Sequence, residues 1–242
     1  MKSNANSYKY RELLKWYRNP ANFPIKKLFN DQVSRVKEHA VGNNALYVGL
    51  SDFKQKFKSA KHLSYIAIDE INSSGDGEPE KKFPFEDNSH DVIIIIHALD
   101  YTDNPHQIVR EIDRIATDDA KVVLVGFNKS SIWGLVKPLM NNMNIPWSLN
   151  FHSLYSVKEW FKLLGYESVY KETGRVFPFI SKNFSKLSDK IKIFQKLYSH
   201  NFGGIYFCVF SKNIIPLTSI KLKFKNKYLV APFPKSSLNR VK

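Results

Sequence analysis

The sequence contains one cysteine, Cys208, which excludes a disulfide framework and a zinc site built on cysteine ligands. Cys208 lies in the apolar run IYFCVF, a setting typical of a small buried hydrophobe rather than a nucleophile. None of the 7 histidines has H-x-x-x-H or H-E-x-x-H spacing, so the sequence predicts no metal site. The motifs G-x-S-x-G and G-x-x-x-x-G-K-S/T are also missing, which argues against a hydrolase nucleophile elbow and a P-loop.

Long apolar runs are missing as well. The longest lie near residues 92–96 and 205–210 and are too short to span a bilayer. The first residues, MKSNANSYKYRELLKWYRN, lack the apolar segment of a secretory signal. The chain has 242 residues and is 43% hydrophobic, enough for one domain with a substantial core. We therefore expect a cytoplasmic protein.

Acidic residues are scarce relative to basic ones. The chain has 37 Lys and Arg against 22 Asp and Glu, which gives a net charge of +15. Such an excess suits an anionic partner such as RNA or a membrane surface. The excess is mostly lysine, however, and a biased codon composition produces the same balance without selection for binding. The basic C-terminal tail, residues 226–242, is either a solvated end or an arm that binds phosphates, so RNA is a possible partner.

Short apolar runs alternate with helical patterns in the first half of the chain. Turn residues bound these runs and β-branched residues are frequent in them, so they predict buried strands, at 45–50, 63–69, 91–99 and 120–127. Helical patterns precede and separate them, at 8–18, 23–40, 51–62 and 105–116. This alternation is typical of an α/β fold with a doubly wound, mostly parallel sheet that carries helices on both faces.

The second half of the chain is less regular. Residues 156–166 predict a helix, and 167–177 and 203–210 predict the last two strands. We expect one domain over residues 1–225, which includes N-terminal helices in 1–42 and a cap insertion at 128–155. Four large apolar side chains of the insertion form either an acceptor pocket or the core of a small cap: Trp133, Met140, Met143 and Trp147.

Polar and small residues follow the predicted strands at the edge where open α/β sheets bind ligands. Asp69 lies twenty residues after Gly49, a spacing that suits a carboxylate accepting both hydroxyls of a ribose. The alternative is that Asp69 only begins a turn. His97 and Tyr101 follow the third strand and are the side chains available for contact with a substrate.

The block FPFEDNSHDVIIIIHALDYTDNPHQIVREIDRI resembles the central block of class I S-adenosylmethionine-dependent methyltransferases. Phe83-Pro84-Phe85 stands for the family's L-P-F-like triplet and Ser89-His90-Asp91 for its S-F-D step. The family's helix signature, R-E-x-x-R, is present as Arg110, Glu111 and Arg114. The segments VVLVGFNKSSIWGL and GGIYFCVFSKNIIPLT are similar to a bacterial subgroup of methyltransferase type 11-like proteins, so the resemblance spans residues 10–225.

This resemblance implies a seven-stranded sheet with an antiparallel last strand, and S-adenosylmethionine as cofactor. The implied reaction is methyl transfer to an unidentified acceptor, a small molecule first and RNA second. The resemblance implies that Glu78 or Glu80 lies near the adenine, and that His97 and Tyr101 contact the acceptor. The residues that it implies for cofactor binding are Gly49, Leu50, Asp69, Glu70, Phe85, His97, Ala98 and Leu99.

The first loop departs from the family pattern. The family has a glycine-rich segment, E/D-x-G-x-G-x-G, whereas this chain has YVGLSDF with Gly49 alone. Glycines let backbone N–H groups approach the cofactor, and Leu50 and Ser51 each add a Cβ there. The alternative is therefore a catalytically inactive methyltransferase-like protein that serves in binding or scaffolding.

Overall fold

The computed structural model describes residues 2–57, 60–67, 82–140, 144–174 and 203–213. Within these ranges a six-stranded sheet forms the middle layer, with strand order β2-β1-β3-β4-β6-β5. Its strands are β1 (Asn44–Gly49), β2 (His62–Ala67), β3 (His90–Ile96), β4 (Ala116–Phe127), β5 (Tyr166–Gly174) and β6 (Ile205–Lys212). Strands β2, β1, β3 and β4 pair in parallel, and β6 is antiparallel to β4 and β5. The mostly parallel sheet with an antiparallel last strand is confirmed, although the described ranges contain six strands where seven were expected.

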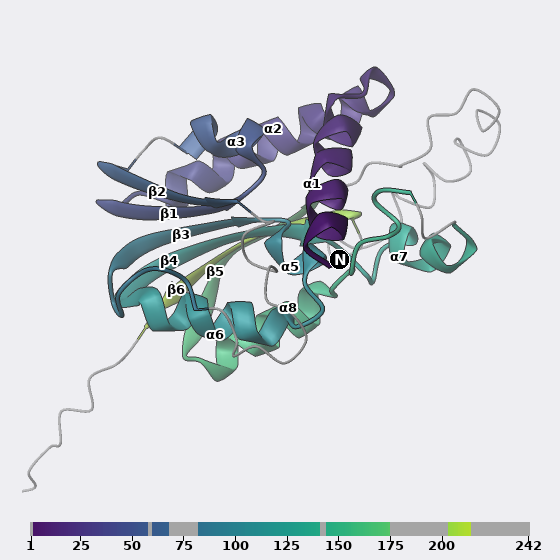
Figure 1. Ribbon diagram of the computed structural model, residues 1–242. Helices are drawn as coiled ribbons and strands as arrows, with labels where there is room; N and C mark the ends of the chain where they lie inside the picture. Colours follow the sequence, from purple (N-terminus) through teal and green to yellow (C-terminus); the bar gives the residue numbers. More distant parts are fainter. Residues whose placement is uncertain (1, 58–59, 68–81, 141–143, 175–202, 214–242) are drawn as a thin grey trace, which may run out of the picture.

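Helices cover both faces of the sheet (Figure 1). One face carries α2 (Phe23–His39), α3 (Ser51–Lys54) and the short helix η2 (Gln55–Phe57). The other carries α6 (Pro105–Ile115) and α8 (Leu154–Leu163). Helix α6 begins at Pro105, where the Asn104 side chain accepts the Gln107 N–H as an N-cap. Its inner face buries four apolar residues, Ile108, Val109, Ile112 and Ile115.

The central strands are apolar on both sides because both faces are covered. Ile93, Ile94, Ile95 and Ile96 are buried in β3, and each such side chain stabilises the fold by about 1.5–3 kcal/mol. Cys208 is buried in β6, and this burial raises the pKa of its thiol to about 12. The thiol is therefore protonated and packs as a small apolar group.

Helix α1 (Lys2–Arg18) stands beside the carboxyl ends of the central strands (Figure 1). It is followed by the one-turn helix η1 (Pro20–Asn22) and by α2. Leu13 and Tyr17 of α1 are buried, and Trp16 lies edge-on against Phe127 at the end of β4. The N-terminal helix thus covers the edge of the sheet where ligands of this fold class bind.

The insertion after β4 contains α7 (Ile132–Val136) and the short helix η3 (Lys137–Leu139). Trp133 and Trp147 are buried, with ring centroids 6.0 Å apart. Trp133 also stacks on Phe127 at 5.7 Å. Both tryptophans therefore pack into the hydrophobic core of the domain, which accounts for their burial without an acceptor pocket. Met140 is half-buried against the same core, and Met143 lies outside the described residues.

Candidate active site

The carboxyl ends of β1, β3 and β4 lie side by side. Val48 pairs with Ile95, and Ile96 pairs with Val125, so the residues after these strands meet at one edge. The structure therefore brings together five of the expected cofactor-binding residues: Gly49, Leu50, His97, Ala98 and Leu99. Asp69 and Glu70, together with Glu78 and Glu80, lie outside the described residues.

Gly49 is required by the close approach of β1 to β3. Its φ is 152°, and a Cβ there would lie 2.7 Å from the Ile96 carbonyl oxygen. Leu50, the next residue, is fully buried, and its carbonyl accepts a hydrogen bond from the Tyr47 hydroxyl at 2.7 Å. The chain then turns directly into α3, so this first loop is short and closely packed.

His97 follows β3 and is held on both ring nitrogens. Its Nδ1 lies 2.7 Å from Asp100 Oδ2, and its Nε2 lies 2.7 Å from the Tyr17 hydroxyl. Asp100 Oδ2 also accepts the Phe127 N–H at 3.0 Å. An ionised carboxylate can only accept hydrogen bonds, so with Asp100 ionised the proton of a neutral His97 ring lies on Nδ1, and Nε2 accepts the Tyr17 O–H. His97 has a φ of 60°, in the left-handed region that non-glycine residues seldom adopt.

The two hydrogen bonds of the His97 ring link three buried side chains, which we call the buried triad: Tyr17, His97 and Asp100. Burial raises the pKa of Asp100, while the bonds to His97 and to the Phe127 N–H act in the opposite direction. Burial, together with the nearby Asp100, raises the pKa of Tyr17 well above its ordinary value. Tyr17 is therefore a hydrogen-bond donor at any physiological pH.

Two buried oxygens next to the triad have no hydrogen-bond partner among the described residues. They are Asp100 Oδ1 and the Tyr206 hydroxyl. Both face Gly126 of β4: a Cβ there would collide with the Tyr206 hydroxyl and lie 3.2 Å from Asp100 Oδ1. Burying a polar group without a partner costs about 1–3 kcal/mol, so this corner of the site carries a stability cost.

Tyr101 lies at the end of the short helix α5 (Ala98–Tyr101) and is also buried. Its hydroxyl donates to the Lys9 carbonyl of α1 at 3.0 Å. The two side chains expected to contact an acceptor, His97 and Tyr101, therefore both bind α1.

Helix α1 also binds the first loop, where the Ser51 N–H donates to the Tyr10 hydroxyl at 3.2 Å. The Gly49 carbonyl is bound from the sheet instead, since it accepts the Tyr65 hydroxyl of β2 at 3.3 Å. At the surface, Arg18 forms a two-pronged ion pair with Asp52 at 2.8 and 2.7 Å. We call α1 with these contacts the cover of the site.

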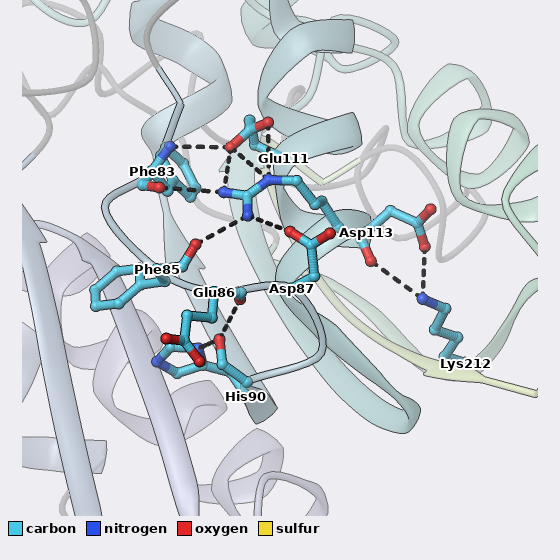
Figure 2. Close-up of polar contacts among 10 residues, drawn as sticks. Phe83, Phe85, Glu86, Asp87, His90, Glu111, Asp113 and Lys212 are labelled. Carbon is cyan, nitrogen blue, oxygen red and sulfur yellow. Dashed lines mark hydrogen bonds and ion pairs between the residues drawn. The ribbon is translucent and has the colours of Figure 1, made fainter.

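Phe85 does not join the group at the carboxyl edge. It precedes β3 and lies edge-on against His90, at the opposite end of that strand from His97. Figure 2 shows why the family signature places it there: Arg114 donates to the Phe83 and Phe85 carbonyls at 3.1 and 2.9 Å, and Glu111 accepts the Phe83 N–H at 2.9 Å. The signature residues thus clamp the loop before β3, and the expectation that Phe85 binds the cofactor is not supported by its position.

Sequence reasoning missed three residues of the site, Tyr17, Asp100 and Tyr206. Asp100 carried a signal, since a residue three positions after His97 lies on the same side of a helical turn. Tyr17 lies 80 residues before His97 and carried none.

Residues 36–124, from the end of α2 into β4, match the family model described as a methyltransferase domain. The uncharacterized protein YafS of Escherichia coli K12 is 31% identical over 169 residues, which cover 65% of this chain and 66% of that protein. The chain thus spans just under two thirds of this relative's length.

Solved structures of low identity share the fold. One is an S-adenosylmethionine-dependent methyltransferase from Thermotoga maritima, described as a possible histamine N-methyltransferase. It matches with a TM-score of 0.54 and 11% sequence identity, and the match covers 84% of this chain and 97% of that chain. A putative methyltransferase from Bacillus halodurans has a TM-score of 0.50 and 15% identity, over 76% of this chain and 98% of that one. In the described ranges no helix has the length and apolarity to cross a membrane.

Proposed function

We propose that this chain is a class I S-adenosylmethionine-dependent methyltransferase, and that it transfers a methyl group to a small-molecule acceptor; the match of residues 36–124 to the methyltransferase domain supports this. The observation that supports this most is the position of His97. It lies at the carboxyl end of β3, inside the matched domain, with both ring nitrogens hydrogen-bonded. A histidine held in this way can accept a proton from an acceptor, which is the help that methyl transfer most often needs besides positioning.

The first loop does not fit the cofactor in the described conformation. Cofactors of this kind need free backbone N–H groups beside the first strand, whereas the Ser51 N–H is bound to Tyr10. Leu50 and Phe53 are buried, and Phe53 lies edge-on against Tyr17 of α1. The proposal therefore requires the cover to withdraw from the first loop before the cofactor enters.

With the cover withdrawn, the proposed cofactor-binding residues are those that meet at the carboxyl edge, namely Gly49, Leu50, His97, Ala98 and Leu99. Asp69 and Glu70 are proposed to hold the ribose, on the spacing from Gly49. His97 and Tyr101 are proposed to contact the acceptor. RNA remains the second acceptor class, and the tail that suggested it, residues 226–242, lies outside the described residues.

Calorimetric titration with S-adenosylmethionine and S-adenosylhomocysteine tests the proposal. We expect a dissociation constant in the micromolar range, and Asp69→Ala should abolish binding because the ribose hydroxyls lose their acceptor. Asp118→Ala, which removes an exposed carboxylate near the start of β4, is the matched control and should bind like the wild type. The absence of heat at near-millimolar ligand would remove the enzymatic assignment.

The second candidate is a catalytically inactive methyltransferase-like protein that serves in binding or scaffolding. The closed first loop favours it, because Leu50 is buried and the Ser51 N–H is already bound. Loosening the cover distinguishes the two candidates. If Tyr10→Phe/Arg18→Ala also fails to bind S-adenosylhomocysteine, the closed loop is permanent and the scaffolding function is the better account.

A further inference from the structure

We infer that the buried triad is the acceptor-recognition element of the site, and that the Tyr17 phenol holds the place of an acceptor that carries a hydroxyl on an aromatic ring. Asp100 is then a positioning residue that fixes the protonation of His97. The inference rests on the proposed function, because it assumes that the edge beneath α1 receives an acceptor. It goes beyond that function by naming the acceptor's chemical class.

The first argument is the hydrogen bonding of His97. Its Nδ1 proton goes to Asp100 Oδ2, which leaves Nε2 as a bare acceptor pointing away from Asp100. The group bound there is a phenol O–H at 2.7 Å, donated by the cover rather than by the sheet. A hydroxyl of an incoming molecule would meet the same acceptor at the same place once Tyr17 leaves with α1.

The second argument is the shape of the slot that holds the Tyr17 ring. Phe29 and Phe53 lie edge-on to this ring, with centroids 5.5 and 5.1 Å away, and His97 lies at 5.7 Å. Phe127 stacks on the far side of the His97 ring at 4.4 Å. Trp16 of α1 also lies edge-on to the Tyr17 ring, at 4.9 Å, but the other neighbours belong to α2, α3 and the central strands, so most of the aromatic wall of the slot is built by the rest of the domain. A ring of similar size fits where the Tyr17 ring lies.

The third argument is that the buried triad stabilises the fold less than apolar side chains of similar volume would. Replacing a buried polar or ionic group by apolar side chains of similar volume is often neutral or stabilising, so the polar groups have no obvious structural benefit here. The left-handed φ of His97 adds to the cost, and so does Asp100 Oδ1, which has no hydrogen-bond partner within the described part of the chain. Costs of this kind concentrate at binding and catalytic sites.

The chemistry that follows is one proton transfer. A hydroxyl bound at Nε2 passes its proton to His97, and the acceptor oxygen keeps the electron pair and becomes the nucleophile. His97 then carries protons on both nitrogens, and the Asp100 carboxylate offsets its positive charge. His97 is the catalytic residue in this scheme, since it alone of the triad touches the acceptor and remains in the domain when α1 withdraws.

Chemical complementation tests the assignment. Tyr17→Ala removes the phenol and leaves a slot that p-cresol can fill. In calorimetry, we expect p-cresol to bind this variant at least about tenfold more tightly than toluene, because a tenfold ratio corresponds to one hydrogen bond. We expect no binding of p-cresol to the wild type, in which the Tyr17 ring fills the slot. Tyr166→Ala is the matched control, because it opens a cavity at another buried tyrosine that lies away from His97. Equal affinity of Tyr17→Ala for p-cresol and toluene would overturn the inference.

A second measurement applies even if Tyr17→Ala fails to fold. Nitrogen-15 NMR of the His97 ring reports which nitrogen carries the proton. We expect the Nδ1-protonated form in the wild type and in Tyr17→Phe, with the Nε2 signal shifted in the latter, and a mixture of both forms in Asp100→Asn. An Nε2-protonated ring in the wild type would overturn the inference.

The two proposals fail in distinguishable ways. If calorimetry shows no binding of S-adenosylmethionine but the p-cresol and NMR results hold, the aromatic hydroxyl site stands and the methyltransferase function falls. If S-adenosylmethionine binds but p-cresol gains nothing over toluene, the function stands and the acceptor class assigned here is wrong.

Discussion

At the residue scale, the packing of the site depends on positions where even one additional atom would collide with a neighbouring side chain. Gly126 is the clearest case, since the Tyr206 side chain occupies the space in which a Cβ would lie and Asp100 Oδ1 would be 3.2 Å from that Cβ. Neither oxygen has a hydrogen-bond partner in the described ranges. Substitutions of Gly126 and Tyr206 should therefore separate the effect of a steric collision on stability from the effect of a buried hydroxyl without a described partner.

Gly126→Ala should lower the free energy of unfolding by about 1–3 kcal/mol, the usual effect of forcing an extra methyl group into a packed core. Tyr206→Phe removes the hydroxyl, the nearer of the two Tyr206 atoms that the new Cβ would meet, and leaves Cζ at 2.7 Å, so the double variant should recover part of the loss. Tyr206→Phe alone should be neutral or stabilising, because its buried hydroxyl has no described partner. Urea unfolding measures all three, and a double variant as unstable as Gly126→Ala would show that the collision lies elsewhere.

Asp100→Asn should change how stability depends on pH. Burial raises the pKa of Asp100 above its ordinary value of 3.8, so the folded state binds this proton more tightly than the unfolded state. Ionisation of Asp100 therefore costs stability as the pH rises above 3.8, and the cost is missing below that value. The stability of Asp100→Asn relative to wild type should increase as the pH rises above 3.8, until Asp100 is ionised in the folded state. A difference that stays constant with pH in urea titrations would contradict this assignment.

The sequence anticipated part of the site at this scale. Gly49 and His97 follow buried strands, and strand ends can be read from apolar runs and turn residues. The partners of His97 could not be read in the same way. Tyr17 reaches it through the packing of a separate helix, and a helical pattern states which face is apolar but not which strand end that face will meet.

At the scale of elements, α1 is held over the site by contacts that differ in kind. Arg18 and Asp52 form an exposed ion pair, and such pairs add little to stability. The Tyr10 hydroxyl binds one loop N–H, whereas Tyr17 is buried and packs against Phe53. The first two contacts can therefore be removed without disturbing the packing of α1.

Tyr10→Phe/Arg18→Ala should leave global unfolding nearly unchanged while it opens the first loop locally. The Ser51 amide loses its acceptor, so its hydrogen exchange should accelerate by about tenfold or more relative to wild type. Lys15→Ala is the matched control, because it breaks an exposed pair with Glu12 on the same helix and does not touch the loop. Equal exchange at Ser51 in all three proteins would mean that α1 does not protect this loop.

Helix α6 holds the loop before β3 through Glu111 and Arg114, and Arg114 makes most of the contacts. Arg114 binds the Phe83 and Phe85 carbonyls as well as Asp87 and Glu111 (Figure 2). Lysine keeps the charge but cannot reproduce this planar fork, so Arg114→Lys should cost about 1–3 kcal/mol. Arg110→Lys, at an exposed position of the same helix, should cost almost nothing. Thermal or urea unfolding would decide, and equal effects of the two substitutions would refute the clamp.

Most elements were predicted near their observed positions because their periodicity is strong. The two N-terminal helical patterns correspond to α1 and α2, and the pattern at 105–116 corresponds to α6. Boundaries moved where tertiary contacts decide. The helix expected at 51–62 is only Ser51–Lys54 followed by a single tight turn, and β4 begins at Ala116 rather than at residue 120. Pairing of Ala116 with His90 supports the early start of β4, and no local pattern encodes such a pairing.

At the scale of the whole molecule, the order of strands follows from the connectivity of the chain. The position of α1 over the carboxyl edge of the sheet does not follow from it. Alternating strands and helices with right-handed crossovers leave few arrangements besides a doubly wound sheet. The sheet order β2-β1-β3-β4-β6-β5 agrees with that expectation. Whether the edge of that sheet is open depends on where α1 packs, and this contact joins residues 80 positions apart. The fold could therefore be predicted from sequence, while the covered state of its site could not.

The central claim is that the edge beneath α1 binds the cofactor once the cover moves. Two-dimensional NMR during titration with S-adenosylhomocysteine tests it most directly, by following the Ser51 amide and the His97 ring together. We predict that both signals shift with one saturation curve, while the amide of Asp118, on the exposed stretch near the start of β4, stays in place. Unchanged Ser51 and His97 signals at millimolar ligand, or shifts confined to other parts of the chain, would contradict the account.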